Sequence, residues 1–558
     1  MYWKSFPESD VVTGVPALRD VRGVAATVVA CMLVCGLTAC LRFLALVGFT
    51  NDQYVTLAGA QQMLFGEWPS RDFLDFGAPL SYAASAAAQL FVGRNLFAEA
   101  LLTSTAFALA ATLTVVAARR LSGSIIVAVG AALVEVAIFP RDYAYPKMLL
   151  YAAAPLVIWW YQDRAWSLRR MAVLAVFVQI AFLFRHDHGL FIGSGALVAA
   201  ALGDGRSAWR RDGARRAAMF SLLAVAAALP YLVYLSLNGG VLAHFAKGFA
   251  YSAAEVADNG LTIPTFGATI GAERNSEAFL FYSFYLLPVI ASLVVWSRRT
   301  GGDGTAAARL VPLVIIALMA DRGFLRDSLE TRLADAVVPA VLLYSWLFGQ
   351  TWRTASSRHR IILRTCVLVT AFIGVLAVTK VGATVEQLNR ASLFGGIRRM
   401  PERFVERNEE LHERFNARQI PAGPVPRLQS FLEYVDRCTT RDQRLLLPGF
   451  IPEVAVYAQR PFAGGRTTIV PGYVDSADDD RQLVAKIATQ VVPFVIVTGK
   501  YKDGVWRAFP ELARYVDQHY RRLVTYGSDG DRAVEVYVTS TVPSPTAIDA
   551  ASGWPCFR

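Results

Sequence analysis

Apolar residues in this chain occur in long blocks that are separated by short polar connectors. Blocks of close to 20 residues are typical of membrane-spanning helices, because the apolar core of a bilayer is about 30 Å thick. The pattern predicts about eleven spans, several of them short, at residues 24–47, 97–118, 125–139, 148–161, 171–184, 190–202, 217–237, 279–296, 310–320, 336–348 and 361–379.

The connectors between these blocks are of two alternating kinds. One kind is rich in arginine and poor in acids, at 119–120, 164–170, 206–216, 298–299 and 353–360. The positive-inside rule assigns these connectors to the cytoplasm. The other kind is mixed in charge and is expected on the external face, at 49–96, 139–147, 185–189, 238–278 and 320–335. A cytoplasmic N-terminus and an odd number of spans then place the tail outside, in the compartment of the opening loop.

The chain becomes polar after Lys380, and its pattern changes to alternating strands and helices. We predict helices at 427–436, 475–490 and 509–523 and strands at 444–450, 492–499 and 532–540. This alternation favours a doubly wound α/β sheet. The predicted fold is therefore a polytopic helical membrane domain (1–380) with a first external loop (49–96), followed by an extracytoplasmic α/β domain (381–558). The tail has no glycine-rich nucleotide motif and no nucleophile elbow, so we expect it to be accessory.

Composition excludes two broad classes of protein. The 558 residues are 54% hydrophobic and only 18% charged, whereas a soluble domain has about 25% charged residues. The net charge of +11 does not indicate nucleic-acid binding, because the arginines lie between apolar blocks. The first apolar block is too long for a cleavable signal peptide.

Cys438 and Cys556 both lie in the polar tail, where they form either a disulfide or two free thiols.

Three carboxylates, Asp52, Asp72 and Asp75, follow directly on the first apolar block. Three interpretations apply to them. They are charges of a solvated loop, caps of short interfacial helices, or parts of a catalytic site. A carboxylate at a membrane surface suits acid–base work, because partial desolvation tunes its pKa.

The opening loop resembles the first external loop of the GT-C superfamily of membrane glycosyltransferases, which use polyprenyl-phosphate-linked sugars. The likeness rests on Asp52 after the first span, on Gly66-x-x-Pro69, and on Arg71-Asp72-Phe73 before Pro79-Leu80. The branch with protein O-mannosyltransferases and lipid A aminoarabinose transferases is the most similar. The resemblance implies that Asp52 is the base on the acceptor hydroxyl and that Asp72 lines the same cavity. Many relatives carry Asp-Glu where this chain has Asp52-Gln53, which weakens any scheme that needs two adjacent acids.

A leaving polyprenyl phosphate requires positive charge nearby. The candidate substrate-binding residues, together with Asp75, are external ones beside the membrane: Arg141, Lys147, Arg185, Asp187, Lys247, Arg322 and Arg326. Arg322 and Arg326 share one face if their loop is helical, although nearby acids also suit them as surface ion pairs. His186 and His188 flank Asp187, but residues at this spacing point apart on a helix, so we assign no metal ligands. No cofactor is expected to be required, and a divalent metal is compatible with the pattern.

These observations predict a glycosyltransferase that moves a hexosyl or pentosyl group to an external glycan, lipid or protein. The resemblance to the GT-C superfamily implies that the transfer inverts the anomeric centre. The expected location is a bacterial inner membrane. The alternative is a transporter or lipid-linked-sugar flippase, which would bury ionisable residues within its spans. Glu135 is one such residue. The sequence does not specify the sugar, the acceptor or the lipid length.

Overall fold

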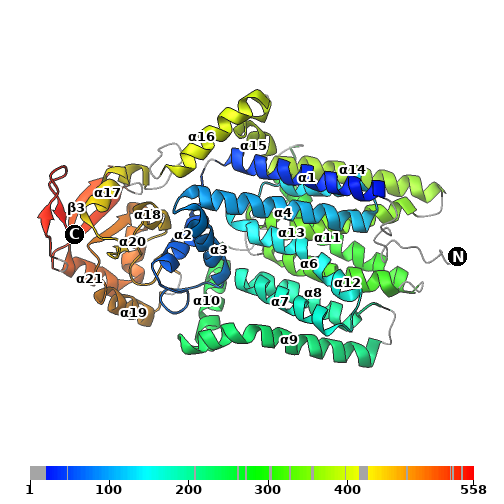
Figure 1. Cartoon of the computed structure of the whole chain (residues 1–558), viewed down its shortest axis with the longest axis horizontal. Coiled ribbons are helices and arrows are strands. Elements are labelled where there is room, and N and C mark those ends of the chain that lie inside the picture. Colours follow the sequence, from blue (N-terminus) through cyan, green and yellow to red (C-terminus); the bar gives the residue numbers. More distant parts are fainter. Residues whose placement is uncertain are drawn as a thin grey trace. The chain divides into compact units, whose positions relative to one another are not determined.

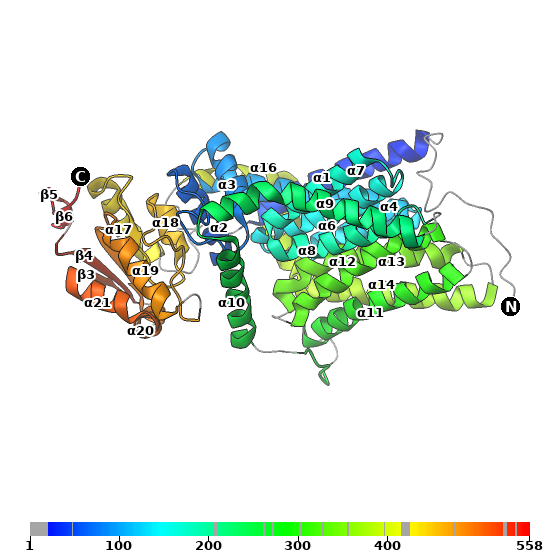
Figure 2. The same cartoon turned by 90° about the horizontal axis from the view of Figure 1, so that it is seen from below.

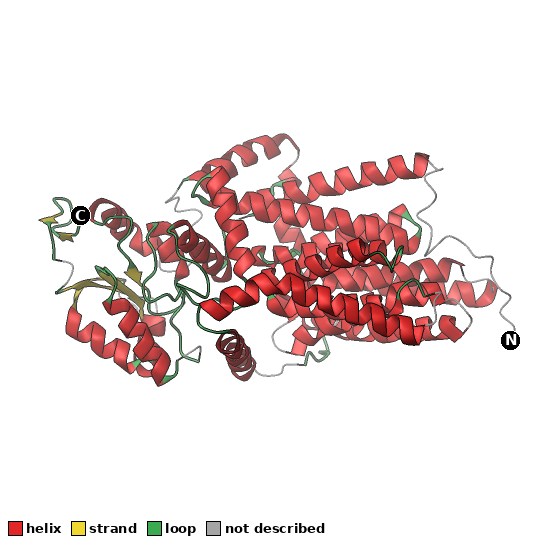
Figure 3. Ribbon diagram, turned by 60° about the horizontal axis from the view of Figure 1, so that its bottom comes forward, coloured by secondary structure: helices red, strands yellow, loops and turns green. Residues whose placement is uncertain are grey.

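The fold is almost entirely helical, with short strands confined to the C-terminal part (Figure 3). A computed structural model describes residues 21–46, 48–205, 209–259, 263–269, 273–300, 304–325, 329–353, 357–395, 397–413, 425–472, 475–527, 530, 533–541 and 544–558. The chain forms two compact units, each discontinuous in sequence. The membrane unit comprises Met1–Ala45, Thr103–Pro230 and Asn259–Arg403, and the loop–tail unit comprises Leu46–Leu102, Tyr231–Asp258 and Phe404–Arg558.

Each of the eleven predicted spans is a helix in the structure (Figure 1). These helices are α1 (Val21–Ala45), α4 (Leu96–Ser122), α5 (Ile125–Ala137), α6 (Tyr145–Gln162), α7 (Leu168–Phe184), α8 (His186–Leu202), α9 (Trp209–Leu237), α11 (Glu273–Thr300), α12 (Gly304–Asp321), α13 (Leu329–Arg353) and α14 (Ser357–Val381). Among the described residues, six helices are long and apolar enough to cross a membrane. The expectation of a polytopic helical membrane protein is therefore confirmed, whereas the number of spans stays a prediction.

The membrane helices run alongside one another and pack through small residues (Figure 2). A Cβ added to Gly195 of α8 would lie 2.6 Å from Ile316 of α12, so only glycine permits this approach. Lipid chains are as apolar as leucine, so such close packing is a main source of helix association in a bilayer. Shorter elements connect or follow the spans: η1 (Asp142–Ala144), η2 (Arg322–Leu325), α15 (Thr384–Arg390), η3 (Leu393–Gly395) and η4 (Ile397–Arg399).

The loop–tail unit combines helices from three parts of the chain with one small sheet. Its helices are α2 (Asn51–Leu64), α3 (Pro79–Val92), α10 (Val241–Asn259), α16 (Met400–His412), α17 (Val425–Cys438), α18 (Pro452–Ala458), α19 (Ala477–Ala488), α20 (Gly499–Ala508) and α21 (Pro510–His519). The strands are β1 (Leu445–Leu446), β2 (Phe494–Thr498), β3 (Tyr520–Tyr526), β4 (Val534–Thr539), β5 (Ala547–Ile548) and β6 (Pro555–Cys556). The predicted α/β character of the tail is confirmed.

The prediction of a doubly wound sheet was wrong. The strand order is β1-β2-β4-β3; β2 is parallel to β1, and β4 is antiparallel to both β2 and β3. The predicted helix 509–523 ends at His519, and the following residues form β3, which returns directly to β4. A direct return of this kind makes an antiparallel pair, whereas a doubly wound sheet needs a crossover helix.

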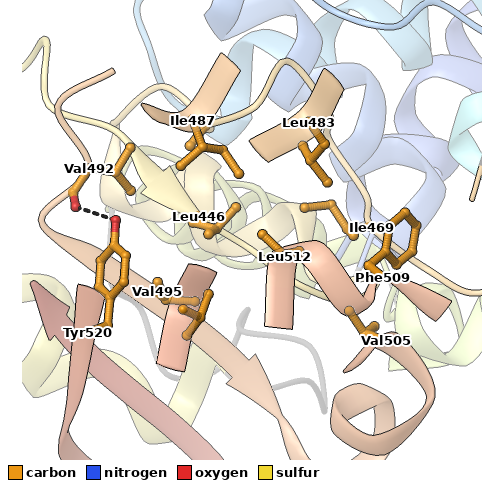
Figure 4. Close-up of a cluster of buried hydrophobic side chains, with 12 residues drawn as sticks. Leu446, Ile469, Leu483, Ile487, Val492, Val495, Val505, Phe509, Leu512 and Tyr520 are labelled. Atoms are coloured by element: carbon orange, nitrogen blue, oxygen red, sulfur yellow. Dashed lines mark hydrogen bonds between the residues drawn. The ribbon is translucent and has the colours of Figure 1, made fainter. Parts of the chain in front are cut away.

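An apolar core and one disulfide stabilise the tail. The core, shown in Figure 4, packs Leu446 and Val495 of the sheet against Leu483, Ile487 and other residues of the surrounding helices. Cys438 and Cys556 form a disulfide that joins the end of α17 to β6, which decides between the two interpretations of these cysteines. The first external loop belongs to the same compact unit as the tail.

Candidate functional site

The first candidate, Asp52, lies in the first turn of α2, seven residues after α1 ends at Ala45. A carboxylate is favourable there, because the amide groups at a helix N-terminus carry partial positive charge. Asp52 is exposed, whereas the next residues, Gln53 and Tyr54, are fully buried. The helix therefore fixes its buried face within the unit and presents Asp52 to solvent directly after the first membrane helix.

Gln53, the residue after Asp52, has a specific partner in this chain. Its side-chain amide donates to one carboxylate oxygen of Glu99, and Ser85 donates to the other oxygen at 2.6 Å. Gln53, Ser85 and Glu99 are all fully buried. A glutamate at position 53 would bring two buried carboxylates together, which is strongly unfavourable unless one is protonated. The departure at Gln53 is therefore explained by packing.

Asp72 forms contacts within its own loop. Its carboxylate accepts a hydrogen bond from the backbone N–H of Trp68 at 2.8 Å and pairs with Arg71 at 2.6 Å. Partial burial acts to raise the pKa of Asp72, but the bonds from Arg71 and Trp68 outweigh it and lower that pKa. Asp72 is therefore held as an anion, and it fixes the tight turn that carries the Arg-Asp-Phe motif.

Asp75 is the buried member of the three. Its Oδ1 accepts from the backbone N–H groups of Gly77 at 2.9 Å and Ala78 at 3.0 Å, at the start of α3. Its Oδ2 is buried without a hydrogen-bond partner. Burial raises the pKa of Asp75 to about 6, although both backbone hydrogen bonds act to lower it. Asp75 thus closes the turn that precedes α3, whose N-cap residue is Ala78 and has no side-chain cap, so the capping interpretation is not confirmed for Asp75.

The tail binds the first loop through a continuous set of contacts. The side-chain amide of Gln62 accepts from Phe462 N–H at 3.2 Å and donates to its carbonyl at 3.4 Å. The ammonium of Lys486 donates to the backbone carbonyl of Asp72. Leu74 N–H donates to the Gly465 carbonyl at 2.9 Å. A further ion pair joins Glu67 to Arg444. These contacts hold the turn with Asp72 at both its ends.

Gly465 is needed at the centre of this contact. Its φ of +65° is in the left-handed region, and an added Cβ would lie 2.6 Å from the Asp72 carbonyl oxygen. Both facts exclude a side chain at this position. The loop and the tail approach each other as closely as backbone allows.

Lys247, a predicted phosphate partner, lies in α10 and pairs with Asp479 at 3.3 Å. Arg466 faces the same carboxylate at 3.8 Å. Lys247 and Arg466 therefore share the carboxylate of Asp479, which also accepts a hydrogen bond from the hydroxyl of Ser476. Nearby, the ring of His244 in α10 contacts Ser70 Oγ at 3.3 Å, which links α10 to the first loop.

The membrane unit brings three other predicted residues into one cluster, of which Lys147 is buried and Arg185 and Asp187 are partly exposed. Lys147 in α6 pairs with Asp335 in α13 at 2.6 Å, and both side chains are more than nine-tenths buried. Arg185 pairs with Asp187 at 2.9 Å. His188 connects the two pairs, because its Nε2 lies 3.7 Å from Asp187 and 4.0 Å from Asp335. A buried ion pair such as Lys147–Asp335 is costly to build, because both charges lose their hydration.

The two histidines of Arg185–Gly189 diverge, as the helical spacing predicted. His188 is buried and its Nδ1 contacts the hydroxyl of Tyr151, whereas His186 stacks on Phe182. Among the described residues, one set of three metal-binding side chains has its donor atoms close together, Cys438, Asp549 and Cys556. Its two sulfurs are joined in the disulfide. The described part of the chain therefore offers no set of ligands for the divalent metal that the sequence allowed.

The remaining candidates are Arg141, Arg322 and Arg326. Arg141 is exposed just before η1, and Arg322 is exposed at the start of η2. Arg326 lies outside the described residues. The structure thus groups Asp72, Asp75 and Lys247 in the loop–tail unit and Lys147, Arg185 and Asp187 in the membrane unit.

Sequence reasoning missed the residues that hold the site together. Arg444, Phe462, Gly465 and Lys486 lie about 400 positions after the loop that they bind, and no local pattern indicates that partner. Asp335 was read as one of several loop acids that neutralise arginines, whereas its partner is Lys147.

The comparisons with known proteins were made over the whole chain. No family model matches the chain, and no curated protein matches its sequence. The solved structure of ArnT from Cupriavidus metallidurans bound to undecaprenyl phosphate is similar, with 13% identity and a TM-score of 0.49 over 94% of this chain and 100% of that chain. The apo state of the same protein gives 13% identity and a TM-score of 0.45 over 93% and 98%. A likeness at this level assigns no residue of this chain a role.

Proposed function

We propose that this chain is an integral-membrane glycosyltransferase that moves a sugar from a polyprenyl-phosphate-linked donor to an extracytoplasmic acceptor. The observation that carries the proposal is the placement of Asp52. A rigid helix presents this carboxylate to solvent directly after the first membrane helix, while its neighbours are buried. The GT-C-like motif of the same loop supports it independently.

In the proposed reaction, an acceptor hydroxyl oxygen attacks the anomeric carbon of the sugar. The new carbon–oxygen bond forms as the bond to the phosphate oxygen breaks, and the electron pair leaves with the polyprenyl phosphate. Asp52 takes the proton of the acceptor hydroxyl. A single displacement of this kind inverts the anomeric centre. The transferred group is a hexosyl or pentosyl unit, and the acceptor is an envelope glycan, a lipid or a protein.

Negative charge develops on the phosphate as its bond to the sugar breaks. The site therefore requires cations that stabilise this developing charge. Lys147 and Arg185 are the proposed partners, because they lie in one cluster with Lys147 buried and Arg185 partly exposed, and a low dielectric strengthens their attraction for an anion. Each is paired with an acid, Asp187 or Asp335, in the structure. The phosphate would therefore have to compete with these two carboxylates for the two cations.

The proposed location is a bacterial inner membrane with the N-terminus in the cytoplasm and the tail outside. Arginine-rich connectors on one face support this orientation. The disulfide between Cys438 and Cys556 supports it too, because disulfides persist outside the reducing cytoplasm.

A transporter or lipid-linked-sugar flippase is the second candidate, and one observation favours it. The buried cluster of Lys147, Asp335 and His188, together with buried Glu135 in α5, resembles the ionisable residues that transporters keep within their spans. The two candidates differ in one requirement. Only the transferase needs the carboxylate of Asp52 for chemistry.

The test is genetic complementation. The gene is deleted in its host, envelope glycans are profiled, and the wild type, Asp52→Asn and the control Asp503→Asn are each restored at equal expression. Asp503 is an exposed acid of α20. A sugar that disappears on deletion, returns with wild type and Asp503→Asn, and stays absent with Asp52→Asn supports the proposal. Full restoration by Asp52→Asn rejects it and favours the flippase.

A further inference from the structure

The last membrane helix, α14, has a strongly apolar exposed face. Phe372, Val375 and Leu376 near its C-terminal end are 64%, 43% and 53% exposed. Such side chains are unfavourable in water and are typical of a surface that contacts lipid chains. The face continues to Lys380, the basic residue in the last turn of the helix. The membrane boundary at this end of α14 therefore lies near Lys380.

The chain turns at this boundary at a fixed point. Gly382 packs so closely on the end of α5 that an added Cβ would lie 2.2 Å from the Ala137 carbonyl oxygen. Thr384 Oγ1 donates to the same oxygen at 2.7 Å. Ala383 between them has a φ of +47°, an uncommon conformation for a residue with a side chain. The structure thus sets α15 in one direction relative to α14.

A cavity of about 560 Å³ lies in the angle between α14 and α15, both labelled in Figure 1. It is lined by Thr379, Lys380, Ala383, Val385, Glu386, Asn389 and Phe394. Val385 and Phe394 are 68% and 64% exposed, which is unusual for apolar side chains beside a cavity that faces water. The size is in the range of ligand sites. An apolar rim with a polar centre suits an amphiphile.

The charge around the cavity is positive. Residues 380–403 contain five basic residues and two acids, which gives a net charge of +3. Glu386, the acid that lines the cavity, is paired with Arg390 at 2.5 Å. Lys380 is therefore the charge that the cavity offers to a ligand. Basic side chains at a membrane surface attract anionic lipid headgroups.

We propose that this cavity binds one anionic phospholipid of the surrounding leaflet. The headgroup phosphate lies against the ammonium of Lys380 and the side-chain amide of Asn389, and an acyl chain follows the exposed face of α14 past Leu376 and Phe372. Phe394 and Val385 cover the glycerol region. The site is separate from the residues proposed for sugar transfer, and it does not depend on that proposal.

The test is native mass spectrometry of the purified full chain in detergent, titrated with phosphatidylglycerol and, separately, with phosphatidylcholine. The variants are Lys380→Gln and Phe394→Ser, with Lys500→Gln as the control, because Lys500 is an exposed lysine of α20 in the tail. One phosphatidylglycerol is expected to remain on wild type and Lys500→Gln. Lys380→Gln is expected to bind it about fivefold more weakly, the effect of one basic side chain at an anionic lipid surface. Phe394→Ser is expected to weaken both lipids equally.

Three results would overturn the proposal. The first is that Lys380→Gln retains phosphatidylglycerol as well as wild type does. The second is that phosphatidylcholine binds as tightly as phosphatidylglycerol, so that charge plays no part. The third is that polyprenyl phosphate competes for the site while phosphatidylglycerol does not bind, which would assign the cavity to the lipid carrier instead. Lys380 and Phe394 are exposed, so neither substitution removes core packing, and an unchanged gel-filtration profile verifies that each variant folds.

Discussion

Gln62 offers a sharp test of the contact between the first loop and the tail. Its side chain is 1% exposed and exchanges two hydrogen bonds with the backbone of Phe462, which is also 1% exposed. Gln62→Leu removes both bonds and a third from the same amide to Glu67, which keeps its ion pair with Arg444, and it keeps a side chain of similar volume. The Phe462 carbonyl still accepts from Arg444 at 3.2 Å. The Phe462 N–H has no other partner among the bonds of the described residues, so it becomes a buried orphan.

The expected cost follows from that one group. A buried donor left without a partner costs about 1–3 kcal/mol. We take about 2 kcal/mol, which is about a 30-fold increase in the population of the locally opened state. Hydrogen–deuterium exchange of a peptide that contains Phe462 measures this population directly. The amide of Phe462 is expected to exchange about 30-fold faster in Gln62→Leu than in the wild type.

The neighbouring residue supplies the control. Gln61 is also buried on α2, and its amide donates to the Val456 carbonyl at 3.2 Å. That carbonyl also accepts from Gln459 N–H at 3.2 Å, and Gln61 Oε1 is already unpartnered. Gln61→Leu therefore orphans no group, and we expect less than a threefold change. Equal acceleration in both variants, or less than threefold in Gln62→Leu, would refute the reasoning.

Three further predictions concern the same unit. Burial raises the pKa of Asp75 from 3.8 to about 6, so its contribution to stability is complete below about pH 4 and is lost as the pH rises through 6. The Asp75→Asn variant keeps the acceptor for the turn, and its melting temperature should lack this fall between pH 4 and 7. Parallel pH profiles of the variant and the wild type would contradict the prediction. Serine at both Cys438 and Cys556 should destabilise the tail by about 2–5 kcal/mol; a melting temperature equal to that of the wild type would exclude a stabilising disulfide. Lys486→Ala should lower sugar transfer by loosening the turn at Asp72, and Lys486→Arg should restore it; an unimpaired alanine variant would remove Lys486 from the site.

Local pattern was sufficient for the membrane helices. Each apolar block became a helix because a helix satisfies every backbone hydrogen bond within its own segment, which a bilayer requires. Asp52 at the start of α2 and the helix that begins after Ser476 follow the same local logic of helix N-termini. The sheet order was not predictable in this way, since strand pairing depends on which distant segments meet.

The sequence by itself therefore determined the class of the protein, the helices and the positions of the candidate acids and cations. Tertiary structure alone decided what each candidate contacts. Asp75 became a buried acceptor in the turn before α3, Asp72 an acceptor in its own turn, and Lys147 the partner of Asp335, 188 positions away. It also showed that the tail binds the first loop through Gln62. The physical reason is that burial and long-range pairing depend on which surfaces pack together, and residue spacing along the chain carries no record of that.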